Sequence, residues 1–374
     1  MFPSRRIAIS GGDKFRDEHS LTFDGSDDYI SAGDITIVDG LDDFSLGVWV
    51  KYLDDSSQSF IDKGGYAGVG AAFGGYYNET VDSGRFRFAI DNGLYFYYNA
   101  SAQYLPQNQW HHTVVTYSNT NDRIFFYFNG IQITPTTNVG TYKAVPSTNH
   151  PVKIGINGSS YSNQKVSEAF IYNKELSPSE VRTLYNGREP YNHKEGIASG
   201  NLKAWWRMGD GVYDIKKGSL ISDEVDSTLG SDLVTEGDFS NGGAAWTANG
   251  TITTAVDGGA FVSTGDADGG YGSCSQAETL TSGNVYLLTF DVTAVTGSPS
   301  VHNYCGQMQT SLGIAEVKTY TNVFLSDGTD GIDVRTICSN GQAVTINNIK
   351  FQLVNGSAAV MTNMEDDDFT GDTP

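Results

Sequence analysis

The sequence predicts an all-β protein with two domains. Hydrophobic residues make up 39% of the chain and charged residues only 18%, and glycine (44), tyrosine (21) and phenylalanine (19) are plentiful. This composition favours short strands joined by glycine turns over helices. Apolar residues also alternate with polar ones between turn residues along most of the chain, which is typical of half-buried strands. At 374 residues the chain is long enough for two domains that each bury a core.

Residues 85–99, RFRFAIDNGLYFYYN, form a predicted β-hairpin. A two-residue loop at Asn92-Gly93 would pair Ile90 with Tyr95, whereas a three-residue loop pairs Ile90 with Leu94. We prefer the second register because it keeps the apolar side chains of both strands on one face. This inward set is Phe86, Phe88, Ile90, Leu94, Phe96 and Tyr98.

The other face of this hairpin then carries Arg85, Arg87, Tyr95 and Tyr97. Guanidinium groups beside phenol rings make a flat, partly apolar surface that suits the faces and hydroxyls of a sugar ring. The alternatives are a solvated sheet face and a contact between subunits. We expect this face to bind carbohydrate.

Strands and turns continue on both sides of the hairpin. SLTFDGSDDYISAG is interpreted as a short strand followed by an acidic turn, and further strands lie in DFSLGVWVKY, WHHTVVTYS and RIFFYFNGIQI. One short helix is predicted from Pro178 to about Asn186, because Ser177 and Glu180 form a capping box and Gly187 provides a stop.

These segments resemble the laminin-G-like family of concanavalin A-type jelly rolls. The matching stretches are FDGSDDYIS, FSLGVWVK, WHHTVVTY, FYFNGIQI, VKIG and EAFIYNKELSPSEVRTLYN. The resemblance implies two antiparallel sheets packed face to face, glycan or protein binding, and often a calcium ion at one edge. Asp27 and Asp28 are the candidate calcium ligands here, although Ser167 replaces an acidic residue of the family pattern. The alternative is a tight turn in which these aspartates cap backbone amides.

A second β pattern resembles the galactose-binding-like sandwiches of carbohydrate-binding modules. Its segments are LVTEGDFSNGGAAWTANGTI, GNVYLLTFDVTAV, TYTNVFLS and AVTINNIKFQLV. The resemblance makes Trp246 and Tyr271 candidate sugar-binding residues, and a core role is the alternative for Trp246. The expected organisation is an N-terminal arm (1–20), a laminin-G-like jelly roll with its linker (21–230), a second β-sandwich (231–355) and a poorly packed acidic tail (356–374).

Several function classes are disfavoured. The net charge of -21 would repel nucleic acid, and no apolar run is long enough for a membrane span. Cys274, Cys305 and Cys338 are too widely spaced for a zinc motif. No strand carries the alternating acids that a glycosidase of this superfamily needs, and the acidic runs at 223–226 and 365–368 are interpreted as solvated charge. We therefore expect no enzymatic activity.

The acidic end and the phrase WWRMGDG are similar to laminin-G-like structural proteins of marine tailed bacteriophages. The start of the chain has no apolar segment of a secretory signal, which fits proteins released by lysis. We therefore expect a non-enzymatic virion protein, a decoration or fibre subunit at the virion surface. Its expected partners are a host glycan, other virion proteins and further copies of itself. The alternatives are a secreted or cell-surface carbohydrate-binding protein, which would be extracellular, and a glycoside hydrolase.

Overall fold

The computed structural model describes most of the chain. The described residues are 15, 17–54, 56–64, 71–78, 85–91, 93–99, 105–211, 220–221, 223–225, 228–266, 268–278, 280–281, 284–305, 308–326, 328, 331–356, 359–362, 364 and 368–374. The basic residues of the expected N-terminal arm, Arg5, Arg6, Lys14 and Arg16, lie outside them.

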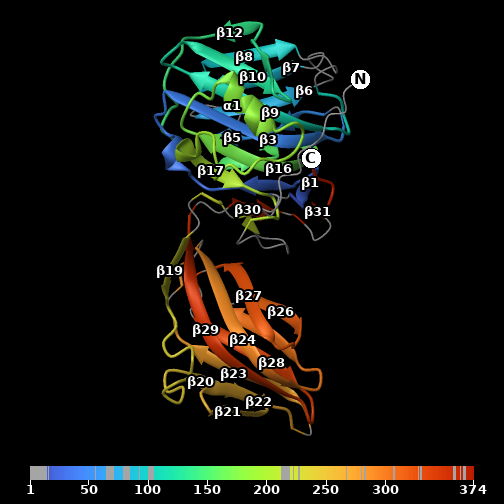
Figure 1. Ribbon diagram of the computed structural model, residues 1–374, viewed down its shortest axis with the longest axis vertical. Helices are drawn as coiled ribbons and strands as arrows, with labels where there is room; N and C mark the ends of the chain where they lie inside the picture. The colour runs from blue at the N-terminus through green and yellow to red at the C-terminus, as the bar shows by residue number, and fades with distance from the viewer. Residues whose placement is uncertain are drawn as a thin grey trace, which may run out of the picture. The chain divides into compact units, whose positions relative to one another are not determined.

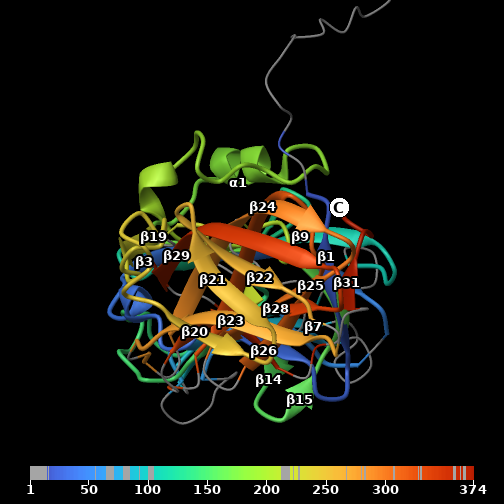
Figure 2. The same cartoon turned by 90° about the horizontal axis from the view of Figure 1, so that it is seen from below.

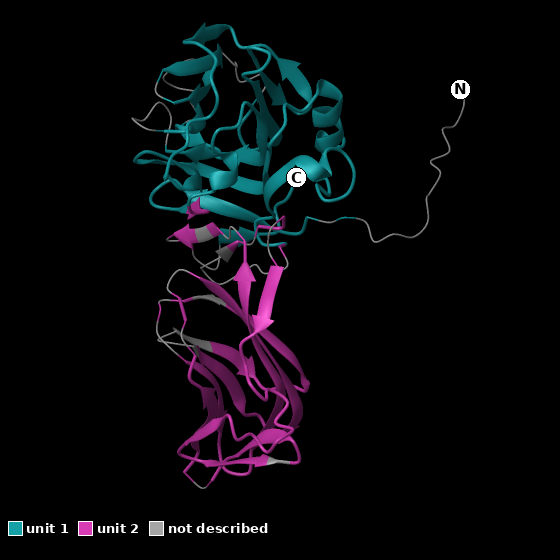
Figure 3. Ribbon diagram, turned by 90° about the vertical axis from the view of Figure 1, so that its left-hand side faces the viewer, with its two compact units in different colours: residues 1–29, 34–210, 367–374 teal, residues 30–33, 211–366 magenta. Residues whose placement is uncertain are grey.

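The chain divides into two compact units, which Figure 3 shows in different colours. The first unit comprises residues 1–29, 34–210 and 367–374, and the second comprises 30–33 and 211–366. The first unit is therefore discontinuous in sequence, because residues 367–374 at the end of the chain belong to it. The change between units falls at residue 210, ahead of the linker expected near residue 230.

One sheet of the first unit contains its longest strands (Figure 1). Its neighbouring strands pair antiparallel throughout the described residues. Its order is β11 (Ile131–Ile133), β10 (Arg123–Phe128), β9 (Trp110–Ser118), β3 (Asp43–Tyr52), β16 (Asn163–Tyr172), β1 (Ser20–Asp24) and β31 (Phe369–Thr370), with β17 (Leu202–Trp206) also paired to β16.

The opposing sheet of this unit carries the predicted hairpin. Its order is β12 (Thr137–Val139), β8 (Leu94–Asn99), β7 (Arg85–Ile90), β6 (Phe73–Asn78), β5 (Asp62–Lys63) and β13 (Val152–Ile154), with β4 (Gln58–Ser59) paired to β6. Between the sheets the ring of Phe86 lies edge-on to Phe126 and Phe128, with centroids 4.9 and 5.3 Å apart. The two sheets thus pack face to face over an aromatic core.

The remaining short elements of the first unit connect these sheets. They are η1 (Thr36–Val38), the ribbon β14 (Ile156–Asn157) and β15 (Ser160–Tyr161), α1 (Pro178–Tyr185) and η2 (Ser199–Asn201). In α1 the side chain of Ser177 accepts from the Glu180 amide, the Glu180 side chain accepts from the Ser177 amide, and Asn186 ends the helix in the left-handed conformation. The predicted helix is confirmed.

The hairpin register is also confirmed. Ile90 pairs with Leu94 and Arg87 pairs with Tyr97, as a three-residue loop requires. Phe86, Phe88, Ile90, Leu94 and Phe96 have no exposed surface. Tyr98, the sixth side chain expected in the core, is only half-buried.

The acidic end of the chain was expected to be poorly packed, and this expectation is wrong. Phe369 and Thr370 pair with β1 at the edge of the first sheet. The carboxylate of Asp372 lies 2.8 Å from the ammonium groups of Lys51 and Lys165. The acidic composition favoured solvation, but two lysines on the paired strands β3 and β16, remote from Asp372 in sequence, provide local counter-charge.

The second unit is a second antiparallel sandwich, and Figure 2 shows its neighbouring strands β22, β29 and β24. One sheet has the order β21 (Thr253–Asp257), β22 (Ala260–Thr264), β29 (Ala343–Asn355), β24 (Val285–Thr296) and β27 (Lys318–Leu325), with β19 (Thr228–Asp232) paired to β29. The other has the order β20 (Thr247–Gly250), β23 (Gly270–Gln276), β28 (Ile332–Cys338), β25 (Ser300–Cys305) and β26 (Met308–Ile314). The short strands β2 (Tyr29–Ser31), β30 (Ala359–Thr362) and β18 (Leu220–Ile221) neighbour one another in that order.

Two acidic side chains of the second unit that were expected to be solvated are buried. Asp223 and Glu224, interpreted as solvated charge, are 0% and 6% exposed, so that interpretation is wrong for these two residues. Of the second acidic run, at 365–368, only Asp368 lies within the described residues. Cys274 and Cys338 are buried free thiols. No helix in the described part of the chain has the length and apolar character needed to cross a membrane.

Candidate functional site

An Arg–Tyr surface, defined as Tyr76, Arg85, Arg87, Tyr95 and Tyr97, lies on the outer face of strands β6, β7 and β8. The strand register places Tyr76 and Tyr97 on either side of Arg87. Gly75 allows this arrangement in β6, since a Cβ there would lie 2.3 Å from the ring of Phe60 in the core. The chain thus turns Tyr76 outward from a tightly packed strand.

Side chains of the Arg–Tyr surface hold one another in place. The guanidinium of Arg87 donates to the Tyr76 hydroxyl at 2.5 Å, and its Cζ lies 5.3 and 5.8 Å from the ring centroids of Tyr76 and Tyr97. The Cζ of Arg85 lies 4.8 Å from the Tyr97 ring, which stacks on Tyr95 with 6.0 Å between centroids. All five side chains are half-buried. Their positions are therefore set before any ligand arrives.

The four residues predicted for this face are thus brought together, and sequence reasoning missed Tyr76. The sequence argument treated only the hairpin of β7 and β8, so it did not identify the neighbour of Arg87 on the β6 side. The signal that could have found Tyr76 is the alternation of side chains along FGGYYN, which places one of its two adjacent tyrosines on the outer face.

A small hollow adjoins the Arg–Tyr surface at Tyr76. Its volume is about 230 Å³, and it is lined by Ser57, Ser59, Tyr76, Asn157 and Ser160. Hydroxyl and amide groups dominate this lining. The hollow therefore offers both hydrogen-bond donors and hydrogen-bond acceptors beside the half-buried tyrosine rings.

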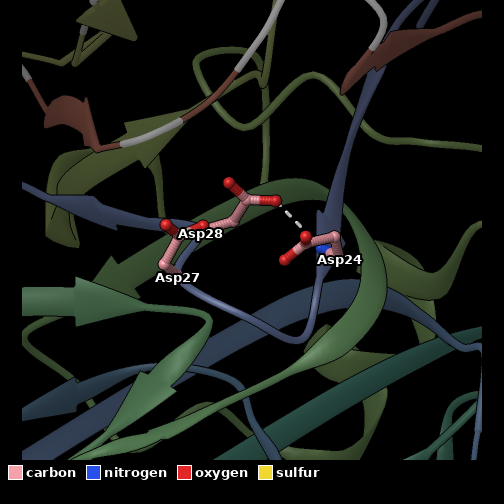
Figure 4. A group of neighbouring side chains, drawn as sticks. All are labelled: Asp24, Asp27 and Asp28. Carbon is pink, nitrogen blue, oxygen red and sulfur yellow. Dashed lines mark hydrogen bonds between the residues drawn. The ribbon is translucent and has the colours of Figure 1, made fainter.

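An acidic turn follows β1 (Figure 4). Ligand oxygens of Asp24, Asp27 and Asp28 lie within 4.8 Å of one another. The Asp28 carboxylate accepts from the Asp24 amide at 2.9 Å, and the Asp24 carboxylate accepts from the Ser26 amide at 2.6 Å. Burial raises the pKa of Asp28 to about 6. Asp24 joins the two aspartates expected from sequence, and the spacing in FDGSDD was the signal that could have found it.

This donor set fits a hard cation in type, since carboxylate oxygens are its preferred ligands. Calcium takes six to eight oxygens, so backbone carbonyls or water would have to complete the shell. The capping hydrogen bonds, the alternative raised from sequence, are also present. Ser167 does not contribute, because its hydroxyl donates to Asp17 at 2.7 Å.

Buried carboxyl groups gather beside Ser167 within the first unit. Glu168, at a bulge in β16 with φ of 50°, accepts from Trp205 Nε1 at 2.5 Å and from Arg207 Nε at 3.3 Å. Burial raises the pKa of Glu168 to about 7. Burial, with the charge of Glu168 next, raises the pKa of Asp17 to about 10. Glu168 is 0% exposed and cannot meet a polysaccharide in this conformation.

The two candidates of the second unit have different surroundings. Trp246 is 8% exposed, packs on Phe239 with centroids 5.4 Å apart, and donates from Nε1 to the Glu236 carbonyl. It is a core residue, so its expected sugar contact is corrected in favour of the alternative. Tyr271 is half-buried on β23, with the Arg335 Cζ 4.4 Å from its ring centroid.

Comparison with known proteins places the first unit in a structural class. Residues 24–182 match the family Laminin_G_3, described as the concanavalin A-like lectin/glucanases superfamily. The resemblance stated from sequence is confirmed at this level, together with the all-β jelly-roll fold. No curated protein matches the chain.

Comparison with solved structures finds similar chains only at low identity and low TM-score. A heptameric SAP-like pentraxin from Limulus polyphemus is 13% identical with a TM-score of 0.37, over 45% of this chain and 82% of that chain. A putative carbohydrate binding protein from Bacteroides ovatus is 13% identical with a TM-score of 0.43, over 56% of each chain. A CBM4 structure is 15% identical with a TM-score of 0.28, over 31% of this chain and 99% of that chain. Likenesses this low carry no information about ligands.

Proposed function

We propose that the first unit binds a glycan through the Arg–Tyr surface and the adjoining hollow. The observation that carries the proposal is the position of Arg87 between Tyr76 and Tyr97. Phenol rings offer apolar faces to the C–H groups of a pyranose, and guanidinium and hydroxyl groups bond its hydroxyls. The lectin-like family of residues 24–182 supports the same class of ligand.

A binding role without catalysis agrees with the placement of the carboxyl groups. A glycosidase needs two carboxyl groups facing one cleft. Glu168 is buried beneath Trp205 and Arg207, and the acidic turn uses Asp24 and Asp28 to cap backbone amides. We therefore propose that the protein is not an enzyme.

The biological setting that we propose is the virion surface, with a host glycan as ligand and neighbouring virion proteins or further copies as partners. It rests on the sequence resemblance alone. Mass spectrometry of purified particles tests it, and absence of the chain from them would favour the secreted or cell-surface alternative.

The binding proposal is tested with a glycan panel and matched variants. We expect specific binding by the full chain and its loss in an Arg87→Ala, Tyr97→Ala double variant. Arg123→Ala is the control, because Arg123 is an exposed arginine on a strand of the opposing sheet and pairs with Glu175. No binding by the wild type, or equal binding by the double variant, would overturn the proposal. An altered oligomeric state of the double variant would instead identify the face as a subunit contact.

A further inference from the structure

The last strands of the two sheets in the second unit meet at a turn, which we call the 314–318 corner. β26 ends the order of one sheet and β27 ends the order of the other, and residues 315–317 join them (Figure 1). Val317 and Ile314 are 66% and 65% exposed, more than any other large apolar side chain in the described part of the chain. Exposed apolar side chains gathered at a sheet edge are typical of a contact with another protein chain.

A third exposed apolar side chain extends the surface of this corner. Ile337, on β28, is 41% exposed. Ile314 and Ile337 both pair with Ser300, one from each side, so the three side chains form a row on the outer face of the sheet. The apolar surface therefore runs from the corner onto the face of the sheet.

Hydrogen bonds from inside the unit hold the backbone of the 314–318 corner. The Tyr320 hydroxyl accepts from the Glu316 amide at 2.8 Å and donates to the Ile314 carbonyl at 3.2 Å. The Tyr320 ring stacks on Phe290 in the core, with centroids 5.3 Å apart. Ile314 and Val317 are therefore held on the outside of the unit, and a partner that covers them loses little free energy in ordering the corner.

Charged groups on either side of Val317 favour a second copy of this chain as the partner. Glu316 and Lys318 form an ion pair of 2.7 Å, and their side chains are 67% and 50% exposed. When two copies meet about a twofold axis at Val317, the Glu316 of each copy faces the Lys318 of the other. The two valines then meet at the axis, and both flanking contacts are attractive.

The net charge of the chain limits where two copies can meet. Each copy carries a net charge of -21, so two copies repel each other in most orientations. At the 314–318 corner the charges of Glu316 and Lys318 cancel, and their order along the chain is complementary to itself. This corner therefore allows two acidic chains to approach without repulsion between the facing groups.

We propose that the 314–318 corner, together with Ile337, is a contact between two copies of the chain that are related by a twofold axis near Val317. Three apolar side chains from each copy bury less area than a permanent dimer needs. We therefore expect a weak association, with a dissociation constant on the order of 10⁻⁵–10⁻⁴ M. The contact lies within the second unit and does not rest on the glycan binding proposed for the first.

Sedimentation of the full chain over a concentration series up to about 0.5 mM tests the proposal. We expect the wild type to pass from monomer to dimer, and Val317→Asp to weaken the dimer by about tenfold or more, because it brings two carboxylates together at the axis. Ile131→Asp is the matched control, since Ile131 is 56% exposed but lies on β11 of the first unit. The double variant of the Arg–Tyr surface should dimerise as the wild type does, which separates this contact from one at that surface.

A charge exchange gives a readout that a folding defect cannot imitate. Glu316→Lys alone brings lysines together across the axis, and Lys318→Glu alone brings glutamates together, so each variant should remain monomeric. Mixed in equal amounts, the two variants should form a mixed dimer, because every lysine again faces a glutamate. A wild type that stays monomeric up to about 0.5 mM, a dimer unaffected by Val317→Asp, or a mixture that stays monomeric while the wild type dimerises would each overturn the proposal.

Discussion

Lys51 and Asp372 form an ion pair of 2.8 Å that ties the last residues of the chain to strand β3. Lys165, the cross-strand neighbour of Lys51, makes a second contact to the same carboxylate, and Trp110 Nε1 donates to it at 3.1 Å. The pKa of Asp372 is held at about 2 by the hydrogen bonds from Lys165, Lys51 and Trp110, which outweigh its partial burial. This carboxylate is therefore a link between the end of the chain and the first unit.

Removing that charge should weaken the first unit. The folded-state pKa of Asp372 lies below the usual 3.8, so its contribution is full above pH 3.8 and is lost as the pH falls towards 2. Because Asp372 is 35% exposed, we expect Asp372→Asn to cost only about 1 kcal/mol at pH 7. Thermal unfolding measures this. Glu316→Gln, in an exposed pair of the second unit, should leave the first unit's transition unchanged, and an equal effect of both variants would contradict the assignment.

Buried imidazoles should make the first unit sensitive to acid. Burial lowers the pKa of His112 to about 3 and that of His193 well below 6.5. Below pH 6.5 the unfolded chain binds protons that the folded chain does not, so stability falls with pH by about 1.4 kcal/mol per pH unit for each group. Neither ring nitrogen of His112 has a hydrogen-bond partner among the described residues, and the centroid of the ring lies 5.0 Å from that of Trp49.

Denaturant unfolding between pH 4.5 and 7.5 tests this with His112→Phe. The variant keeps an aromatic ring in place, and we expect it to show a shallower loss of stability in acid than the wild type. Identical pH slopes for the two proteins would rule out a neutral buried imidazole at this position.

Asp17 should make the protein less stable as the pH rises, whereas the buried histidines make it less stable as the pH falls. Its pKa is raised above 3.8, so the folded chain keeps a proton that the unfolded chain releases, and stability is lost as the pH rises towards 10. Asp17→Asn should therefore stabilise the protein at pH 8 by about 1.4 kcal/mol or more, the equivalent of one pKa unit. Unfolding at pH 5 and pH 8 gives the comparison, and a variant less stable than the wild type at pH 8 would be the contrary outcome.

Calcium is proposed for the acidic turn on its donor chemistry. We expect weak binding, with a dissociation constant on the order of 10⁻⁴–10⁻³ M, because the turn supplies few carboxylates. Millimolar calcium should then raise the unfolding temperature of the wild type, and Asp28→Asn should abolish the shift. A wild type that melts at the same temperature in calcium and in chelator would assign the turn to backbone capping alone.

Local patterns were enough to predict the elements that depend on adjacent residues. Alternation and a short loop fixed the register of Arg87 with Tyr97, and the capping box located the start of α1. Distant contacts escaped sequence reasoning. Arg335 contacts Tyr271 and Tyr304 only because the strands β23, β28 and β25 pair in this register. Trp246 is buried by core residues that are distant from it in sequence.

The burial of acidic side chains was also predicted wrongly, because it depends on contacts between residues distant in sequence. An acidic composition at the end of the chain favours solvation, but the lysines that bind Asp372 are more than two hundred residues away in sequence. Asp223 and Glu224 are likewise buried by neighbours that no local pattern indicates. Pairing between remote strands, rather than propensity, decides where these side chains lie.

The most direct test of the central claim is an equilibrium titration of the best glycan from the panel against wild type, Arg123→Ala and the Arg87→Ala, Tyr97→Ala double variant. The account predicts that the first two bind equally and that the double variant binds at least about tenfold more weakly while remaining folded. Equal affinity of all three proteins would place the glycan elsewhere and contradict the assignment of the Arg–Tyr surface.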